Sequence, residues 1–308
     1  MKLRLPTSAI LLLALTLQSC TTEVWVDDVV TGPTPWQTRQ LLESHELWYV
    51  DIHATQGPGE VPFLQTAFTL TFGQGTLLAN NNLVGIGKSG DGLGVPIGTY
   101  APLDGAVEIY HALDGLWALE VFPAGSHGLE LYDPHTGTSY FLQGYSRAGF
   151  NYDQLFYDNI HFFLQEYSAW EKTFASEAGA LNDFDAEQFL QFLAGGASDT
   201  FRSSLDVPGT PLPSLQWDYE GIYTVYDVPG DPELKTLTLD YDFMGNDYFE
   251  LYVLDDGNIE LYHPVSGTVY RFSGRGYRQF LKEGEAPARK RIRRDLPEMK
   301  VQRQRPKT

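Results

Sequence analysis

Between residues 46 and 145, apolar and polar positions alternate in short runs that are separated by glycine-, proline- and aspartate-rich turns. Alternation with a period of two is typical of strands with one buried face. The connections are too short to hold crossover helices, so we expect neighbouring strands to be antiparallel. The pattern predicts a β-meander unit over 45–148, with strands at 46–54, 62–72, 76–82, 97–101, 106–113, 116–122, 128–133 and 138–145.

The apolar period changes after this unit. From Asp153 to Phe174 the apolar residues recur every three or four positions, which predicts an amphipathic helix. A second short helix is expected to begin at Asp185, with Gln188 reaching back to cap it, and to end at a Gly-Gly pair at 195–196. We therefore predict a helical segment over 152–196, a linker over 197–214 and a second β-meander unit over 215–282 with five candidate strands.

The two strand-rich units contain a repeat. Residues 129–144 and 259–274 align without a gap, and eight of the sixteen pairs are identical. The alignment extends backwards at the same offset, and "GTY" at 98–100 resembles "GIY" at 221–223. The identical pairs are Glu130/Glu260, Leu131/Leu261, Tyr132/Tyr262, Pro134/Pro264, Gly137/Gly267, Thr138/Thr268, Tyr140/Tyr270 and Gly144/Gly274. The predicted fold class is mainly antiparallel β with a helical insertion: two β-meander units, the second a partial copy of the last five strands of the first.

Several stretches of the first unit resemble the lipocalin-like domains of lipoproteins from Bacteroidota-type bacteria. They are Trp48 on the first strand, "FTLTFGQGTLLA", "GTY" and the closing "LWALEVF…LELYD…TGTSYFL". The resemblance covers about residues 46–148 and, more faintly, 217–278. That family usually has glycine two places before the tryptophan, where this chain has Glu46. The resemblance implies a barrel-like architecture more than it implies a function.

The N-terminus has the features of a secretion signal. Lys2 and Arg4 precede an apolar run from Ala9 to Leu17, which is too short to span a bilayer, and "LQSC" ends at Cys20. This ending resembles the lipobox of bacterial lipoproteins. The resemblance implies a signal peptide over 1–19, diacylglyceryl and acyl (palmitate) groups on Cys20, and an anchor and linker over 20–44. Since Thr21 rather than aspartate follows, it also suggests the outer membrane.

Charge is distributed unevenly along the chain. Residues 21–285 contain 38 acidic and ten basic residues, whereas nine of the 21 Lys and Arg residues lie in 286–308. An acidic body repels nucleic acid and anionic lipid at long range. The basic tail over 283–308 lacks aromatic residues and apolar periodicity, so we predict that it is disordered and solvated. Docking on anionic envelope polymers or on the acidic body is the alternative.

No catalytic constellation emerges from the sequence. Cys20 is the only cysteine, the seven histidines form no metal-binding motif, and the glycine-rich stretch 85–94 is a surface loop rather than a phosphate loop. Two carboxylate pairs, Glu120/Glu130 and Glu250/Glu260, recur in both units and could serve a glycoside hydrolase. Asp240, Asp242 and the stretch 255–258 could hold calcium, although turn chemistry explains the latter. We predict no catalytic residue, no metal and no cofactor.

The resulting hypothesis is a lipid-anchored envelope protein that binds a protein, a glycan or a small apolar ligand without catalysis. One alternative is a hydrolase of envelope or extracellular polysaccharide that uses the paired carboxylates. Another is a structural part of an outer-membrane assembly.

Overall fold

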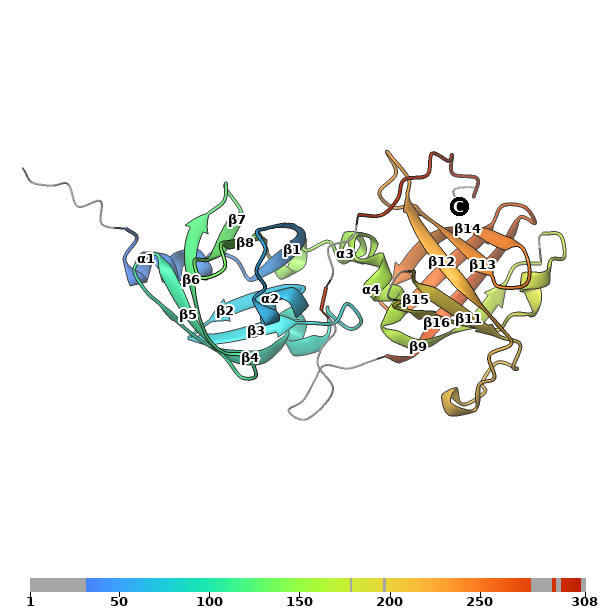
Figure 1. Cartoon of the computed structure of the whole chain (residues 1–308), viewed down its shortest axis with the longest axis horizontal. Helices are drawn as coiled ribbons and strands as arrows, with labels where there is room; N and C mark the ends of the chain where they lie inside the picture. The colour runs from blue at the N-terminus through green and yellow to red at the C-terminus, as the bar shows by residue number, and fades with distance from the viewer. Residues whose placement is uncertain (1–31, 178, 196–197, 278–289, 292–294, 306–308) are drawn as a thin grey trace, which may run out of the picture. The chain divides into compact units, whose positions relative to one another are not determined.

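The computed structural model of the chain describes residues 32–177, 179–195, 198–277, 290–291 and 295–305. The first unit forms a closed antiparallel barrel in which each strand pairs with its neighbour in the sequence and β1 pairs with β8 (Figure 1). All eight expected strands are present. They are β1 (Leu47–Gln56), β2 (Thr69–Gly73), β3 (Thr76–Asn80), β4 (Val95–Pro102), β5 (Ala106–His111), β6 (Gly115–Pro123), β7 (Gly128–Asp133) and β8 (Thr138–Tyr145).

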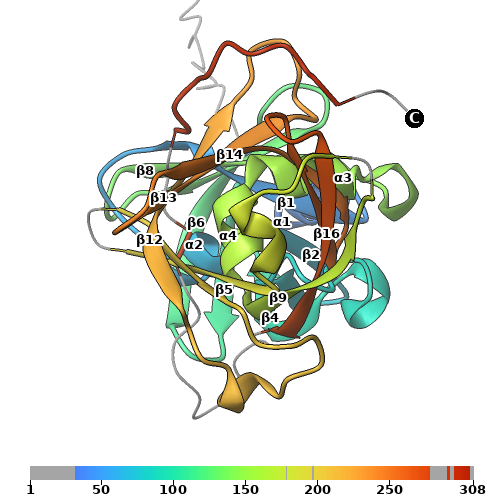
Figure 2. The ribbon, with the colours of Figure 1, turned by 90° about the vertical axis from the view of Figure 1, so that its right-hand side faces the viewer.

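The second unit is also a closed eight-strand barrel, not the partial copy that the repeat predicted. Figure 2 shows this ring of strands end-on. The mainly antiparallel β class is confirmed, and the second copy is complete because three strands lie in the stretch expected to be helical or linker. The strands are β9 (Tyr167–Ala175), β10 (Phe189–Leu193), β11 (Thr200–Ser204), β12 (Tyr219–Asp227), β13 (Lys235–Tyr241), β14 (Asn246–Asp255), β15 (Asn258–His263) and β16 (Thr268–Tyr277).

The predicted helical segment was wrong beyond residue 165. Two short helices, α3 (Tyr152–Asp158) and α4 (Ile160–Gln165), are followed directly by β9. A spacing of four residues places side chains on one face of a strand as well as of a helix, so Trp170 and Phe174 did not discriminate between the two. The helix expected to begin at Asp185 is also absent: a single 3-10 turn, η3 (Asp183–Ala186), stands there before β10 begins. Its cap is Asn182, and Asp185 rather than Gln188 reaches back to close the capping box.

Short helices also occur in the first unit. α1 (Pro35–Leu42) lies in the region predicted to be linker, and its N-terminus is closed by a reciprocal capping box between Thr34 and Gln37. α2 (Pro62–Thr66) replaces the first half of the second predicted strand. Further 3-10 turns are η1 (Ser89–Gly92), η2 (Arg147–Gly149) and η4 (Leu212–Ser214).

A tryptophan connects each barrel to the helix before it. Trp48 Nε1 donates to the Leu42 carbonyl at 2.7 Å, and Trp170 Nε1 donates to the Leu164 carbonyl at 2.8 Å. Both indoles are fully buried, so each ring contributes apolar area while its single polar group keeps a partner. This shared contact shows that the duplication extends to the first strand and the preceding helix.

Two repeated glycines allow the first strand of each barrel to close against the last. A Cβ at Gly144 would lie 2.4 Å from the His45 ring, and a Cβ at Gly274 would lie 2.4 Å from the Tyr167 ring. Each ring belongs to the residue three positions before the buried tryptophan. Any larger residue at either glycine would displace this ring.

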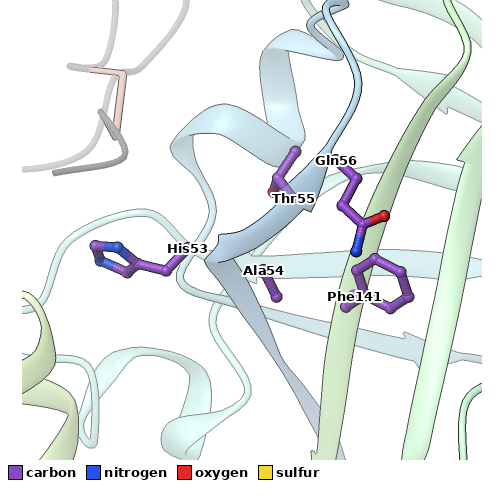
Figure 3. A pocket seen from close by; sticks show the side chains of 5 residues that line it. All are labelled: His53, Ala54, Thr55, Gln56 and Phe141. Carbon is purple, nitrogen blue, oxygen red and sulfur yellow. The ribbon is translucent and has the colours of Figure 1, made fainter. Parts of the chain in front are cut away.

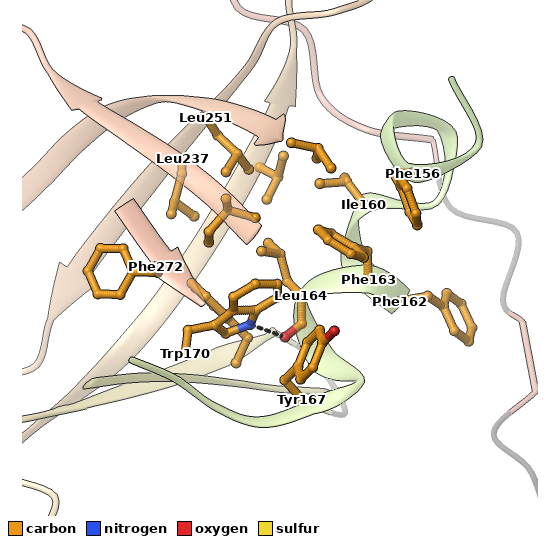
Figure 4. Packing of buried hydrophobic residues seen from close by; sticks show 14 of the residues in the cluster. Phe156, Ile160, Phe162, Phe163, Leu164, Tyr167, Trp170, Leu237, Leu251 and Phe272 are labelled. Atoms are coloured by element: carbon orange, nitrogen blue, oxygen red, sulfur yellow. Dashed lines mark hydrogen bonds between the residues drawn. The ribbon is translucent and has the colours of Figure 1, made fainter. Parts of the chain in front are cut away.

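Side chains fill the interior of both barrels. In the first, Leu77, Ile109, Leu131 and Tyr140 belong to one buried cluster. In the second, Trp170 packs among Leu237, Leu251 and Phe272, below the apolar face of α4 (Figure 4). The strands therefore enclose packed cores.

Candidate functional site: two outward glutamate–aromatic clusters

The fold explains most of the identities in the repeat. Leu131/Leu261 and Tyr140/Tyr270 are buried in the cores, and Gly137/Gly267 adopt positive φ at a hairpin turn. Glu130/Glu260 and Tyr132/Tyr262 have no such role, because they alternate with core residues and therefore lie on the outer face of the sheet. Outward residues that recur in both copies are therefore the first candidates for a site.

Cross-strand pairing assembles these residues into an outer cluster on each barrel. In the first barrel Glu120 pairs with Tyr132 and Phe122 pairs with Glu130. In the second, Glu250 pairs with Tyr262 and Tyr252 pairs with Glu260, in the same register. Each outer cluster thus consists of two glutamates and two aromatic residues.

A segment of the C-terminal tail covers the outer cluster of the second barrel. We call residues 297–305 the C-terminal strap. It begins beside β12, where the Asp227 backbone N–H donates to the Pro297 carbonyl at 2.9 Å and the Asp227 backbone carbonyl accepts the Met299 N–H at 2.8 Å. Val301 then packs against a small buried group formed by Val228, Leu234 and Tyr252. The strap is held by backbone pairing and apolar contact before it reaches the glutamates.

Both glutamates of the second cluster are buried by the strap. Glu250, 1% exposed, accepts the backbone N–H groups of Gln304 and Arg305 at 2.5 and 3.1 Å, and the Tyr252 hydroxyl at 2.7 Å. Glu260, 0% exposed, lies 2.9 Å from Arg271 Nε and 2.6 Å from Arg305 Nη2. Buried carboxylates need such partners, because an unpaired one would carry a large desolvation cost.

Two strap arginines lie against one aromatic ring. The guanidinium groups of Arg303 and Arg305 lie 5.2 and 5.1 Å from the centre of the Tyr252 ring. Arg303 also forms a forked ion pair with Asp231, with contacts of 2.7 to 3.0 Å. The cluster therefore recognises an Arg-x-Arg sequence through charge, ring stacking and main-chain hydrogen bonds.

The prediction of a solvated tail was wrong for the described residues 295–305. Docking on the acidic body, the alternative expectation, is what these residues do. Sequence pattern missed it because the strap has no periodicity of its own: its order comes from pairing to β12 and to two glutamates distant in sequence. The excess of basic residues was the available signal.

Among the residues that the structure describes, no segment covers the outer cluster of the first barrel. Phe122 is 43% exposed, and Glu120, Glu130 and Tyr132 are half-buried. Glu130 accepts the Ser139 hydroxyl at 2.6 Å, and no Lys or Arg in the described ranges forms an ion pair with either glutamate. A surface pocket of about 460 Å³, lined by His53–Gln56 and Phe141, lies beside it, since Phe141 pairs with Glu130 (Figure 3).

This arrangement does not match a glycoside hydrolase. In both barrels the two glutamates lie on adjacent strands of one outer face, not on opposite walls of a cleft. In the second barrel they are also covered by the strap. The chemistry that the geometry favours is recognition of cationic side chains.

A second polar group, which the sequence did not reveal, lies inside the second barrel. Lys172, 7% exposed, donates to the carbonyls of Phe184 and Asp185 at 3.1 Å each, and its ammonium lies 4.9 Å from the Tyr270 ring centre. Burial lowers the pKa of Lys172 to about 8, against the opposite influence of Glu187 and Asp185.

Glu187 lies in the same interior. It is 2% exposed, and its Oε1 accepts the Tyr241 hydroxyl at 2.8 Å. Burial raises the pKa of Glu187 to about 7, despite hydrogen bonds that favour the charged form. Neither Glu187 nor Lys172 is accessible to a substrate in this conformation, so we assign both to the packing of the barrel rather than to catalysis.

The remaining candidates gain no support. Cys20 lies outside the described residues. The Asp255 carboxylate accepts the backbone N–H of Gly257 and the side-chain amide of Asn258, at 2.8 Å each, as turn chemistry predicts. The stretch 85–94 connects β3 to β4 without a helix of the length a phosphate loop requires. In the part of the chain that the structure describes, no group of three His, Cys, Asp or Glu side chains could hold a metal ion.

Comparison with known proteins adds no assignment: no protein-family model matches the chain, and no curated protein matches it. Membership of the lipocalin-like family therefore stays a prediction.

Proposed function

We propose that this protein is a lipid-anchored envelope protein whose barrels act as non-enzymatic interaction modules. One observation carries the proposal: an outer glutamate–aromatic cluster already holds an extended polypeptide, the C-terminal strap. The barrel interiors are filled by their own side chains, which favours binding on the outer faces. Protein is thus favoured as the partner over a small apolar ligand.

The anchor is proposed to be Cys20, at the end of the lipobox-like sequence. None of the helices that the structure describes is long and apolar enough to cross a membrane. Each buried methylene of an acyl chain contributes about 0.8 kcal/mol, so two or three chains would hold the protein durably. The outer membrane is the expected location.

Two measurements test this function. Cys20→Ala should abolish labelling by an alkyne fatty acid and release the protein from the membrane fraction. Retention of the variant after a high-salt wash would contradict the anchor. Separately, affinity purification of the wild-type protein from native membranes should recover a protein partner, whereas glycan turnover by the purified protein would support the hydrolase alternative instead.

A further inference from the structure

The strap shows what an outer cluster can bind. Residues 303–305 place two arginines against one aromatic ring while the intervening backbone donates to a glutamate. In an extended chain, side chains two residues apart point to the same side, so an Arg-x-Arg sequence presents both guanidinium groups together. The recognised feature is short, extended and doubly cationic.

The first barrel presents the same cluster in the same register. Glu120 and Glu130 correspond to Glu250 and Glu260, Phe122 to Tyr252, and Tyr132 to Tyr262. Alternation with the core residues Leu119, Val121, Leu129 and Leu131 fixes all four on the outer face. Of the residues that contact 303–305 in the second barrel, Glu250, Glu260 and the ring of Tyr252 thus have counterparts here, and Asp231 does not. Arg271, which pairs with Glu260 rather than with the strap, is not repeated either.

The lack of an arginine at the position of Arg271 makes the first cluster more favourable for a cationic ligand. Arg271 neutralises Glu260, whereas its counterpart Phe141 leaves Glu130 with only a hydroxyl partner among the described residues. The pocket beside Phe141 adds room for one more side chain, against an apolar ring and the polar groups of Thr55 and Gln56 (Figure 3). This surface therefore has two glutamates and an exposed ring, and none of the described Lys or Arg residues forms an ion pair with either glutamate.

We propose that the outer cluster of the first barrel binds an extended Arg-x-Arg segment of a partner protein. The partner is a separate protein because this chain's own Arg303 and Arg305 are already bound to its second barrel. The other two Arg-x-Arg sequences of the chain, at 289–291 and 291–293, share Arg291, which is buried and donates to the carbonyls of Val50 and Ala67. Arginine is preferred because its planar guanidinium group stacks on an aromatic ring better than the ammonium group of lysine does. The inference rests on the proposed interaction function and deepens it by naming the surface and the ligand chemistry.

The test uses the chain from residue 20 to 308, with its strap intact, and a fluorescent peptide with the sequence of residues 301–306, VQRQRP. We expect saturable binding by fluorescence anisotropy that weakens as salt is raised. The double variant Glu120→Gln/Glu130→Gln should raise the Kd of the peptide by about tenfold or more, because charge-assisted hydrogen bonds are lost. The matched control is Glu108→Gln, another half-buried glutamate on the neighbouring strand β5, which should leave Kd unchanged.

Three results would overturn the proposal. They are no binding of the peptide, equal binding of a VQKQKP peptide, or binding that is lost in Glu250→Gln/Glu260→Gln but kept in the first-barrel variant. The last would mean that the peptide exchanges with the strap.

A different partner would be indicated by a dimer in sedimentation that is lost with Glu120→Gln/Glu130→Gln. This result would also contradict the proposal, because it would assign the site to the tail of a second copy. Unchanged circular dichroism and Tm show that each variant is folded, and failure here leaves the membrane-purification result unaffected.

Discussion

The two barrels share a frame but differ inside it. Each has the buried tryptophan, the preceding helix and the glycine that admits a ring. By strand register, however, Val50 of the first barrel corresponds to Lys172 of the second. Val50 pairs with Leu142 and Lys172 pairs with Phe272, and each of these partners lies two residues before the repeated glycine. The frame tolerates a buried ammonium where its copy has a methyl-bearing side chain, provided that carbonyls and aromatic rings surround it.

The outer faces differ in the opposite sense. The sequence of the glutamate–aromatic cluster is nearly the same in both barrels, but the strap covers one, whereas no described segment covers the other. The difference comes from a segment that is remote in the sequence, not from the cluster itself. Repeated residues can therefore serve stability in one copy and remain available for binding in the other.

The largest expected effect tests the shared frame. Trp170→Ala should lower the free energy of unfolding by about 4 kcal/mol, because a fully buried indole leaves a cavity and an unpaired Leu164 carbonyl. Trp48→Ala should have a similar effect. Urea denaturation followed by circular dichroism provides the measurement, with the partly exposed Trp117→Ala as a control. If either variant lost less than about 1 kcal/mol, the two barrels would not depend on the buried tryptophan to the same extent.

The next effect belongs to the second barrel alone. The pKa of Glu187 rises from 4.5 to about 7 on folding, so the folded state binds a proton that the unfolded state has released between these values. Stability therefore falls as pH rises through this window and stays reduced above it. Glu187→Gln should remove this slope and raise the free energy of unfolding at pH 8 by up to about 3 kcal/mol, with little change at pH 4. Denaturation curves at the two pH values measure it, and equal slopes in variant and wild type would refute it.

The smallest of the three concerns the covered face. Arg305→Ala should lower the free energy of unfolding by about 2 kcal/mol, because Glu260 would lose one of its two cationic partners while remaining largely buried. Lys300→Ala, an exposed change in the same strap, should alter it by less than about 0.5 kcal/mol. If both variants unfold alike, the strap contributes nothing specific to the covered cluster.

Sequence pattern predicted the first barrel well because its strands alternate cleanly and its turns contain glycine. It failed over Tyr167–Leu193 for a definable reason: real helices lead straight into β9, and the spacing of Trp170 and Phe174 suits either structure. A repeat that does indicate β9 is present in the sequence: Trp170 lies six residues after Leu164, just as Trp48 lies six residues after Leu42. Extending the repeat to these pairs would have predicted a complete second barrel.

The candidate site was only half predictable. The recurrence of Glu130 and Glu260 marked the right residues, and paired carboxylates first suggested hydrolysis. Their true relation depends on strand register and on Arg305, which is 45 positions away from Glu260 in the sequence. Lys172 and Glu187 were not identifiable, because nothing in their neighbouring residues distinguishes a buried charge from a solvated one.

Closure of both barrels has a consequence for crowding. An open sheet ends in strands with unpaired N–H and C=O groups, which can add strands from neighbouring molecules and seed polymers. Here β1 pairs with β8 and β9 pairs with β16, so neither ring has such an edge. If many copies are concentrated on one membrane, and each copy carries two similar hairpins, strand exchange between neighbours would first require a ring to open. Closure therefore protects a duplicated sequence from aggregating with itself.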